Sequence, residues 1–319
     1  MIPSRPAIPR IPNNTRRNAF SRLLATAVAV AGLALSGCHG GPKAAPAKTL
    51  PEWQARRTRS VAGTNGWATL VGLHWLPEGR STCGSDPAQT HVFPAGRAPG
   101  FVGTWIREGR KVRFVPADGI AATVDGKPVP SRPLRSDFHG AKPEVVRIGD
   151  LAVTVIVRGD RVGLRVRDPQ APTRVHFQGL DYFPERPDWV VSGRLIPAKP
   201  GTLLPVLNIL GDIEEMPAAG TVVFEKDGRE FRLDVALDTE EDDLFLLFKD
   251  ATSGQETYPA GRFLHTAKPG RDGRVVLDFN RAYNPPCAFT AFATCPLPPR
   301  QNRMDIRVEA GELRYRGGH

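Results

Sequence analysis

The sequence predicts a mainly β protein, built of antiparallel strands in sandwich- or barrel-like sheets, with a short N-terminal helix. Two stretches, 151–168 and 221–238, alternate apolar and polar residues on both sides of a Gly-Asp or Asp-Gly pair, which is typical of a β-hairpin. Further Asp-Gly turns stand at 118–119, 125–126 and 272–273. Because 32 glycines and 31 prolines separate short apolar runs, the chain favours strands joined by tight turns.

The helix is predicted at residues 51–60, "PEWQARRTRS". Pro51 suits the first turn, where a helix needs no backbone N–H, and Trp53 supplies an apolar anchor. Almost all of the chain after this segment has strand or loop character.

The N-terminus has the order of an export signal. Residues 1–22 contain five arginines and no acid, and the apolar run 23–35 that follows is too short to span a bilayer as a helix. "LSGC", which ends at Cys38, resembles the lipobox of bacterial lipoproteins, in which the signal is cut before the cysteine and the thiol carries a diacylglycerol. The alternative is a plain secretory peptide with an incidental cysteine. "TRRNAF" is similar to a twin-arginine signal, so the choice between the Sec and twin-arginine routes stays open.

The lipoprotein resemblance implies a lipid-anchored protein of the cell envelope. His39 replaces the aspartate that marks inner-membrane retention, which implies the periplasmic face of the outer membrane. Loss of the five arginines of residues 1–37 lowers the formal net charge from +10 to +5, an ordinary value that does not indicate nucleic acid as a partner. The membrane is the expected partner through the anchor, and protein partners stay open.

Four segments follow from these observations. We expect a lipoprotein signal peptide at 1–37 and a flexible tether rich in Gly, Pro and Ala at 38–49. The polar, loop-like stretch 131–144 predicts a boundary between an N-terminal β unit, 50–140, and a C-terminal β unit, 141–319.

Four longer blocks resemble the family called domain of unknown function 1684. They are "GWATLVGLHWLPEG" (66–79), "TSGQETYPAGRFL" (252–264), "LDFNRAYNPPCAF" (277–289) and "TCPLPPRQNR" (294–303). Their order and spacing agree with the family over roughly residues 50–312, and the C-terminal β unit, 141–319, is expected to carry the family motifs. It implies no established reaction. Cys83 stands where the family has an aliphatic residue, which implies a buried core thiol.

The chain has no familiar catalytic or metal-binding motif, and no cofactor or metal is predicted. The histidines of the body are scattered singly, and a lone histidine is more often a surface or core residue than a ligand. They are His74, His91, His139, His176 and His265.

Two cysteines, Cys287 and Cys295, are predicted to form a disulfide. The seven residues between them do not suit a zinc knuckle, and the periplasm is oxidising. Closing so short a loop would contribute about 2–3 kcal/mol. A nucleophilic cysteine is the alternative, but no histidine lies in this stretch to act as its base.

A ligand site is predicted beside the proline-rich loop 284–303. Asp278 and Asn280 share one face of the strand that precedes the loop, and Arg262 offers a donor suited to a carboxylate or phosphate. The alternative is a buried strut in which Arg262 pairs with Asp278. The candidate ligand-binding residues are Tyr258, Arg262, Asp278, Asn280, Tyr283 and Asn284.

These observations predict a lipid-anchored periplasmic protein that binds a polar small molecule, either a sugar or an anionic metabolite, near loop 284–303. One alternative is an envelope hydrolase that uses Asp278 or Glu256 as general base. The other is a structural envelope component without a ligand. Whether the protein is an enzyme stays open.

Overall fold

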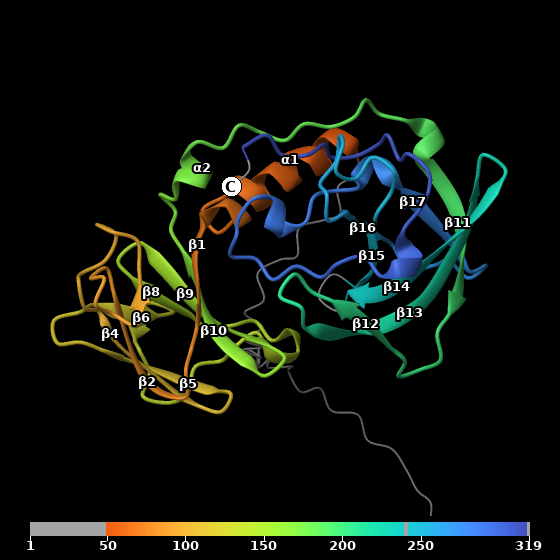
Figure 1. Ribbon diagram of the computed structural model, residues 1–319. Helices are drawn as coiled ribbons and strands as arrows, with labels where there is room; N and C mark the ends of the chain where they lie inside the picture. Colours follow the sequence, from red (N-terminus) through yellow and green to blue (C-terminus); the bar gives the residue numbers. More distant parts are fainter. Residues whose placement is uncertain (1–48, 239–241, 318–319) are drawn as a thin grey trace, which may run out of the picture. The chain divides into compact units, whose positions relative to one another are not determined.

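The computed structural model describes residues 49–238 and 242–317, and this part of the chain is mainly β, as predicted (Figure 1). The predicted signal peptide, Cys38 and nearly all of the tether lie outside the described residues. Every pair of neighbouring strands in the described sheets is antiparallel except β2 with β3. Within the same residues, no helix has the length and apolar character needed to cross a membrane.

The predicted N-terminal helix is confirmed as α1, Leu50–Ala62. Thr49 begins it with a capping box: Glu52 N donates to Thr49 Oγ1 at 3.3 Å, and Thr49 N donates to Glu52 Oε2 at 3.0 Å. Its buried residues are Arg57 and Val61, so the helix packs through one face only.

Two sheets form a sandwich around one core. The six-stranded sheet has the order β1 (Leu70–Trp75), β10 (Arg161–Arg167), β9 (Leu151–Arg158), β8 (Val145–Ile148), β6 (Ala122–Val124), β7 (Lys127–Pro128). The four-stranded sheet has the order β3 (His91–Val92), β2 (Gly79–Gly84), β4 (Gly103–Glu108), β5 (Lys111–Pro116). Trp105 and Leu164 meet in the shared core. Cys83 lies there too, fully buried as expected, and burial raises the pKa of its thiol to about 12.

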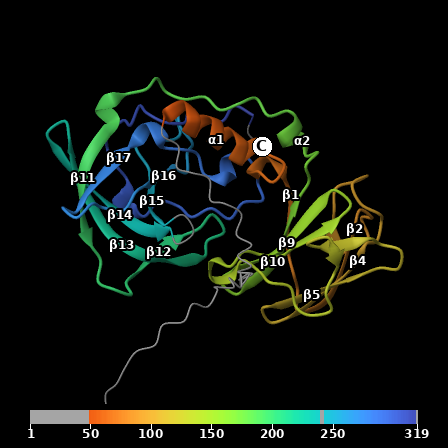
Figure 2. The ribbon, with the colours of Figure 1, turned by 180° about the vertical axis from the view of Figure 1, so that it is seen from behind.

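The third sheet has the order β16 (Arg262–Thr266), β15 (Asp243–Phe248), β14 (Arg229–Asp238), β13 (Ile213–Lys226), β11 (Val190–Pro197), β17 (Arg274–Asp278). A seventh strand, β12 (Leu203–Leu207), pairs only with β13. A core lies on each face of this sheet over β14, β15 and β16, whereas β11, β12 and β17 alternate buried and exposed side chains. One core contains Phe248 and Leu264, and the other contains Phe245 and Cys295 of loop 284–303. Figure 2 shows the same strands from behind.

The two predicted hairpins are confirmed. β9 and β10 pair with Val157 opposite Val162, and β13 and β14 pair with Lys226 opposite Arg229. Asp227 and Gly228 of the second turn have φ angles of 52° and 71°, the left-handed conformations that a tight two-residue hairpin requires.

The described short helical turns are η1 (Trp67–Thr69), η2 (Phe138–Gly140), α2 (Pro172–Val175), η3 (Pro187–Trp189), η4 (Phe279–Arg281), η5 (Pro286–Ala288) and η6 (Arg300–Asn302). The six-stranded sheet takes strands from both sides of residue 140, because β1, β6 and β7 precede it and β8, β9 and β10 follow it.

Candidate functional site

Hydrogen bonds to three strands hold loop 284–303 in place. Asn302 is fully buried, and its Nδ2 donates to the carbonyls of Asp234 in β14 and of Leu247 in β15, at 2.8 Å each. Asp234 N donates in turn to Asn302 Oδ1 at 2.7 Å. The backbone of Leu297 donates to Leu207 O in β12 at 2.7 Å. These hydrogen bonds therefore fix the loop on the sheet.

Cys287 and Cys295 are buried free thiols in this structure. Cys287 N donates to Cys295 Sγ at 3.1 Å. The interaction of the two thiols raises the pKa of Cys295 and lowers that of Cys287. The structure brings the two cysteines together but does not show the disulfide, which stays a prediction.

Arg262 is a strut, and its partner differs from the expected one. It is fully buried, with Nη2 3.3 Å from Asp250 Oδ1 and 2.8 Å from Val308 O, and its Nη1 donates to Ala310 O. Asp250 Oδ2 also accepts from Val308 N at 2.8 Å. The pair thus binds the segment 308–310 to the end of β15. Burial lowers the pKa of Arg262, whereas Asp250 opposes this effect.

Asp278 and Asn280 belong to a different network. Asp278 Oδ2 lies 3.0 Å from Arg281 Nε, and Asp278 Oδ1 accepts from Asn280 N. Asn280 binds the backbone of Arg186 through both amide atoms, at 2.8 and 3.0 Å. Asp278 and Asn280 are neighbours, but not through strand alternation: β17 ends at Asp278, which caps the turn η4 that contains Asn280. Arg262 binds elsewhere. The hydrogen bonds of Arg262 and those of Asp278 and Asn280 thus belong to separate networks.

Asn284 joins α1 to the C-terminal segment. Its N donates to Glu312 Oε2 at 2.8 Å, and its Nδ2 donates to Leu313 O at 2.7 Å. Arg57 of α1 donates to Asn284 O at 2.7 Å and pairs with Glu312 at 2.8 Å. Both views show α1 beside this blue segment (Figures 1 and 2). The Arg57 guanidinium also lies 4.5 Å from the ring of Tyr283. Asn284 therefore fastens one end of the loop.

Tyr258 and Glu256 also have structural partners. Tyr258 OH donates to Cys287 O at 2.9 Å, which ties it to the loop. Glu256 pairs with Arg307. Both carboxylates considered as general bases, Glu256 and Asp278, thus pair with a guanidinium, and Glu256 Oε2 is buried without a hydrogen-bond partner among the described residues. No group of three His, Cys, Asp or Glu side chains in residues 49–238 and 242–317 is arranged to hold a metal ion.

Loop 284–303 contacts a cluster of arginines that the sequence analysis missed. We call this cluster the arginine face. It consists of Arg158, Arg165 and Arg167 of β9 and β10, together with Thr294 of the loop. Thr294 Oγ1 accepts from Arg158 Nε at 3.0 Å and from Arg165 Nη2 at 3.3 Å. Arg165 and Arg167 point away from the sandwich core because the intervening Val166 points into it.

The arginine face has an excess of positive charge. Asp137 and Glu214 both pair with Arg158, at 2.9 and 3.7 Å. Arg165 is only 7% exposed, and burial together with the charges of Arg158 and Arg167 lowers its pKa to about 10. The buried Nε atoms of Arg165 and Arg167 have no hydrogen-bond partner among the described residues. Two guanidiniums with free donors favour an anion at this position.

Two tryptophans of the block 66–79 border this surface. Trp67 lies 5.7 Å from the Arg165 guanidinium and 5.9 Å from that of Arg167. Trp75 lies opposite Gly163, where a Cβ would stand only 2.8 Å from the ring. A glycine in β10 therefore lets the second ring approach the sheet, and the face has aromatic as well as cationic character.

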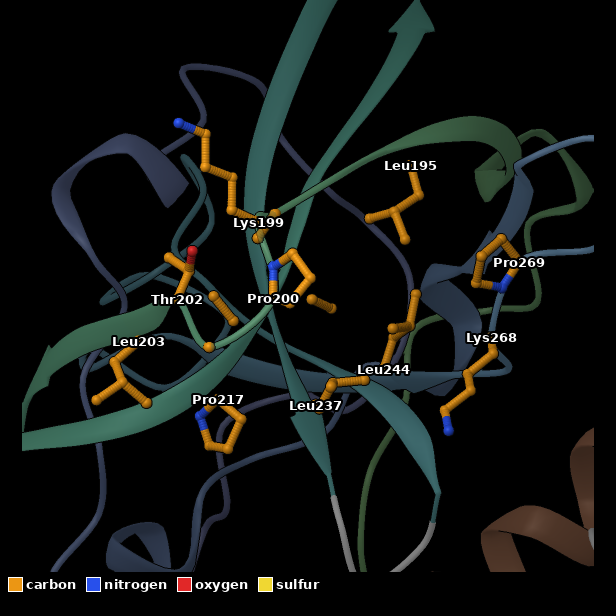
Figure 3. A pocket seen from close by; sticks show the side chains of 14 residues that line it. Leu195, Lys199, Pro200, Thr202, Leu203, Pro217, Leu237, Leu244, Lys268 and Pro269 are labelled. Carbon is orange, nitrogen blue, oxygen red and sulfur yellow. The ribbon is translucent and has the colours of Figure 1, made fainter. Parts of the chain in front are cut away.

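A separate pocket of about 530 Å³ opens between β12, β13 and the ends of β14 and β15 (Figure 3). Its lining is mostly apolar and includes Leu195, Leu203, Pro217, Leu237 and Leu244, with Lys199 and Lys268 at the rim. None of the six sequence-predicted ligand residues lines it.

Residues 175–313 match the model of the family described as protein of unknown function (DUF1684). No curated protein matches the chain significantly. A solution NMR structure of an uncharacterized protein of Haloarcula marismortui is similar at 35% sequence identity; the match covers 46% of this chain and 82% of that chain, with a TM-score of 0.38.

Proposed function

Because residues 175–313 belong to DUF1684, a family of unknown function, we propose a function from the geometry of this chain itself: it binds an anionic small molecule between the arginine face and loop 284–303. One observation carries this proposal. Arg165 is almost fully buried, has no carboxylate partner among the described residues, and has an Nε without a hydrogen bond.

Burying a charge without a partner costs folding free energy. We therefore expect such a charge where a bound ligand of opposite charge pairs with it. The guanidinium offers parallel donors that match a carboxylate or a phosphate. Trp67 adds a flat apolar wall 5.7 Å from the Arg165 guanidinium, which suits the ring of a sugar. A sugar acid or a sugar phosphate combines both features.

The experiment compares Arg165→Met with the wild type in titrations with glucuronate and inorganic phosphate. We expect at least a tenfold loss of affinity, since a charged hydrogen bond contributes about 1.5–3 kcal/mol. The free variant should melt no lower than the wild type, because removing Arg165 leaves no carboxylate behind. Arg147→Met, at an exposed arginine of neighbouring β8, is the matched control and should bind normally.

Equal binding of neutral glucose, or unchanged affinity in Arg165→Met, would refute the proposal. If the wild type binds none of these ligands, the alternative of a structural envelope component gains support. The hydrolase alternative has less support, because Glu256 and Asp278 are both engaged by arginines.

The proposal includes a place in the cell: a lipid anchor at Cys38 on the periplasmic face of the outer membrane. It is supported by the basic, apolar and "LSGC" order of residues 1–38 and by the non-acidic His39. In that oxidising compartment we expect Cys287 and Cys295, which already share a hydrogen bond, to form a disulfide.

A further inference from the structure

Exposed apolar side chains gather on one part of the third sheet. Eleven large apolar residues are exposed in the described residues, and five of them lie within residues 196–213. They are Ile196, Leu203, Leu207, Ile209 and Ile213. Leu203 lies opposite Pro217, and Leu207 lies opposite Ile213, so these pairs share the outward face of the β12–β13 hairpin. Such a concentration marks an interaction surface better than scattered exposed residues do.

The pocket of Figure 3 is continuous with this face, because Leu203 and Pro217 form one of its walls. Leu237 and Leu244 also line the pocket, and Leu244 belongs to a buried core of the sheet. The pocket of about 530 Å³ has a size typical of small-molecule sites.

The backbone builds this opening. A β-bulge between Ala218 and Gly220 interrupts the pairing of β13 with β14. Gly220 has a φ of 141°, and a Cβ there would stand 2.1 Å from Ile196 O, so only glycine allows the close approach of β11. β12 pairs with β13 alone, and its first residue, Leu203, lines the pocket.

Two lysines stand at the rim of the apolar pocket. Lys268 pairs with Asp242, whereas Lys199 is exposed and has no ion-pair partner among the described residues. An apolar interior with a cation at its mouth complements a molecule with an apolar tail and an anionic head.

We infer that this pocket binds the acyl chain of a single-chain anionic amphiphile, a fatty acid or a lysophospholipid, with the head group beside Lys199. The tail contacts Leu203, Pro217 and Leu237, and the exposed hairpin provides an apolar approach. This site is separate from the arginine face and does not depend on it.

The test measures binding of dodecanoate and decanoate to the whole protein by isothermal titration calorimetry below their micellar concentrations. Each buried methylene is worth about a three- to fourfold gain in affinity, so dodecanoate should bind about tenfold more tightly than decanoate. Leu203→Glu should abolish binding. Leu207→Glu is the matched control, because Leu207 has the same exposure on the same strand face but does not line the pocket, and it should bind as the wild type does.

Two further variants test the head-group contact and the independence of this pocket from the arginine face. Lys199→Gln should weaken dodecanoate about two- to fivefold, the range for an exposed ion pair, without changing dodecanol binding. Arg165→Met should bind dodecanoate normally, so that failure of the anion site and failure of this site are distinguishable.

Two outcomes would overturn the inference. One is equal affinity for the two chain lengths or equal loss in Leu203→Glu and Leu207→Glu. The other is a protein that sediments with phosphatidylglycerol vesicles but shows no calorimetric binding of dodecanoate, with both variants losing the vesicle binding equally. That result would make the hairpin a membrane-docking surface and not the entrance to a lipid pocket. Retained vesicle binding in Leu207→Glu but not in Leu203→Glu would support the pocket, with the lipid taken from a bilayer.

Discussion

At the scale of single residues, Arg262 shows how one buried side chain connects distant segments. Its guanidinium binds Asp250 and the carbonyls of Val308 and Ala310, and its Nε lacks a described partner. The sequence indicates that an arginine in an apolar strand needs a partner. It does not identify Asp250 among the acids of the chain, because this choice depends on how β15 ends and on where the C-terminal segment returns.

Replacing Arg262 with Met should destabilise the protein by about 3–5 kcal/mol, because the change leaves Asp250 buried without its cation. Urea unfolding of the purified protein measures this difference. Arg281→Met, which breaks the partly exposed pair with Asp278, is the control and should cost less than about 1 kcal/mol. Equal losses in the two variants would show that Arg262 is not the buried strut described above.

At the scale of elements, local patterns predict hairpins well and buried surfaces poorly. Alternation and the turn pairs at 159–160 and 227–228 are local, and both hairpins have the expected turns. The same alternation puts Arg165 and Arg167 on one face of β10. What covers that face is not local, since Thr294 lies 129 residues after Arg165. The sequence predicts a ligand site beside loop 284–303. The arginines that contact this loop could be identified only from the tertiary structure.

The sandwich should lose stability in mild acid because of a histidine between its strands. His91 Nε2 lies 2.9 Å from Ser81 Oγ, and its ring lies 5.5 Å from that of His74. Burial, and then the charge of His74, lowers the pKa of His91 to about 4. Between its ordinary pKa of 6.5 and about 4, the unfolded chain therefore binds more protons than the folded one, and stability falls as the pH falls.

From pH 7 to pH 4 this residue should remove up to about 3 kcal/mol, which urea unfolding at several pH values measures. His91→Gln should flatten the profile in that window, whereas exposed His176→Gln should not. Glu144 acts in a lower window: Arg132 lowers its pKa to about 2, so its contribution disappears only between about pH 4.5 and 2. A wild-type profile that is flat between pH 6.5 and 4 would contradict the prediction.

At the scale of the whole molecule, polar contacts join the sandwich to the third sheet and its loop. Arg158 and Arg165 bind Thr294, and Arg161 pairs with Asp212 at the start of β13. The proposed anion site thus combines strands β9 and β10 of the sandwich with loop 284–303, which packs on the third sheet. Two blocks far apart in the sequence, 66–79 and 294–303, meet there, because Trp67 and Thr294 both lie beside Arg165.

The proposed export of the chain would determine both its anchor and the state of its thiols. If Cys38 carries the lipid, Cys38→Ala should move the protein from the membrane fraction to the soluble periplasm, because the acyl chains supply most of the membrane affinity. His39→Asp is the matched variant: it should stay membrane-bound but change from the outer to the inner membrane.

Non-reducing peptide mapping of the exported wild type should recover Cys287 linked to Cys295, with Cys83 alkylated only after denaturation, because Cys83 is fully buried. Membrane association that persists in Cys38→Ala would exclude this anchor, and a bridge that includes Cys83 would exclude the predicted pairing.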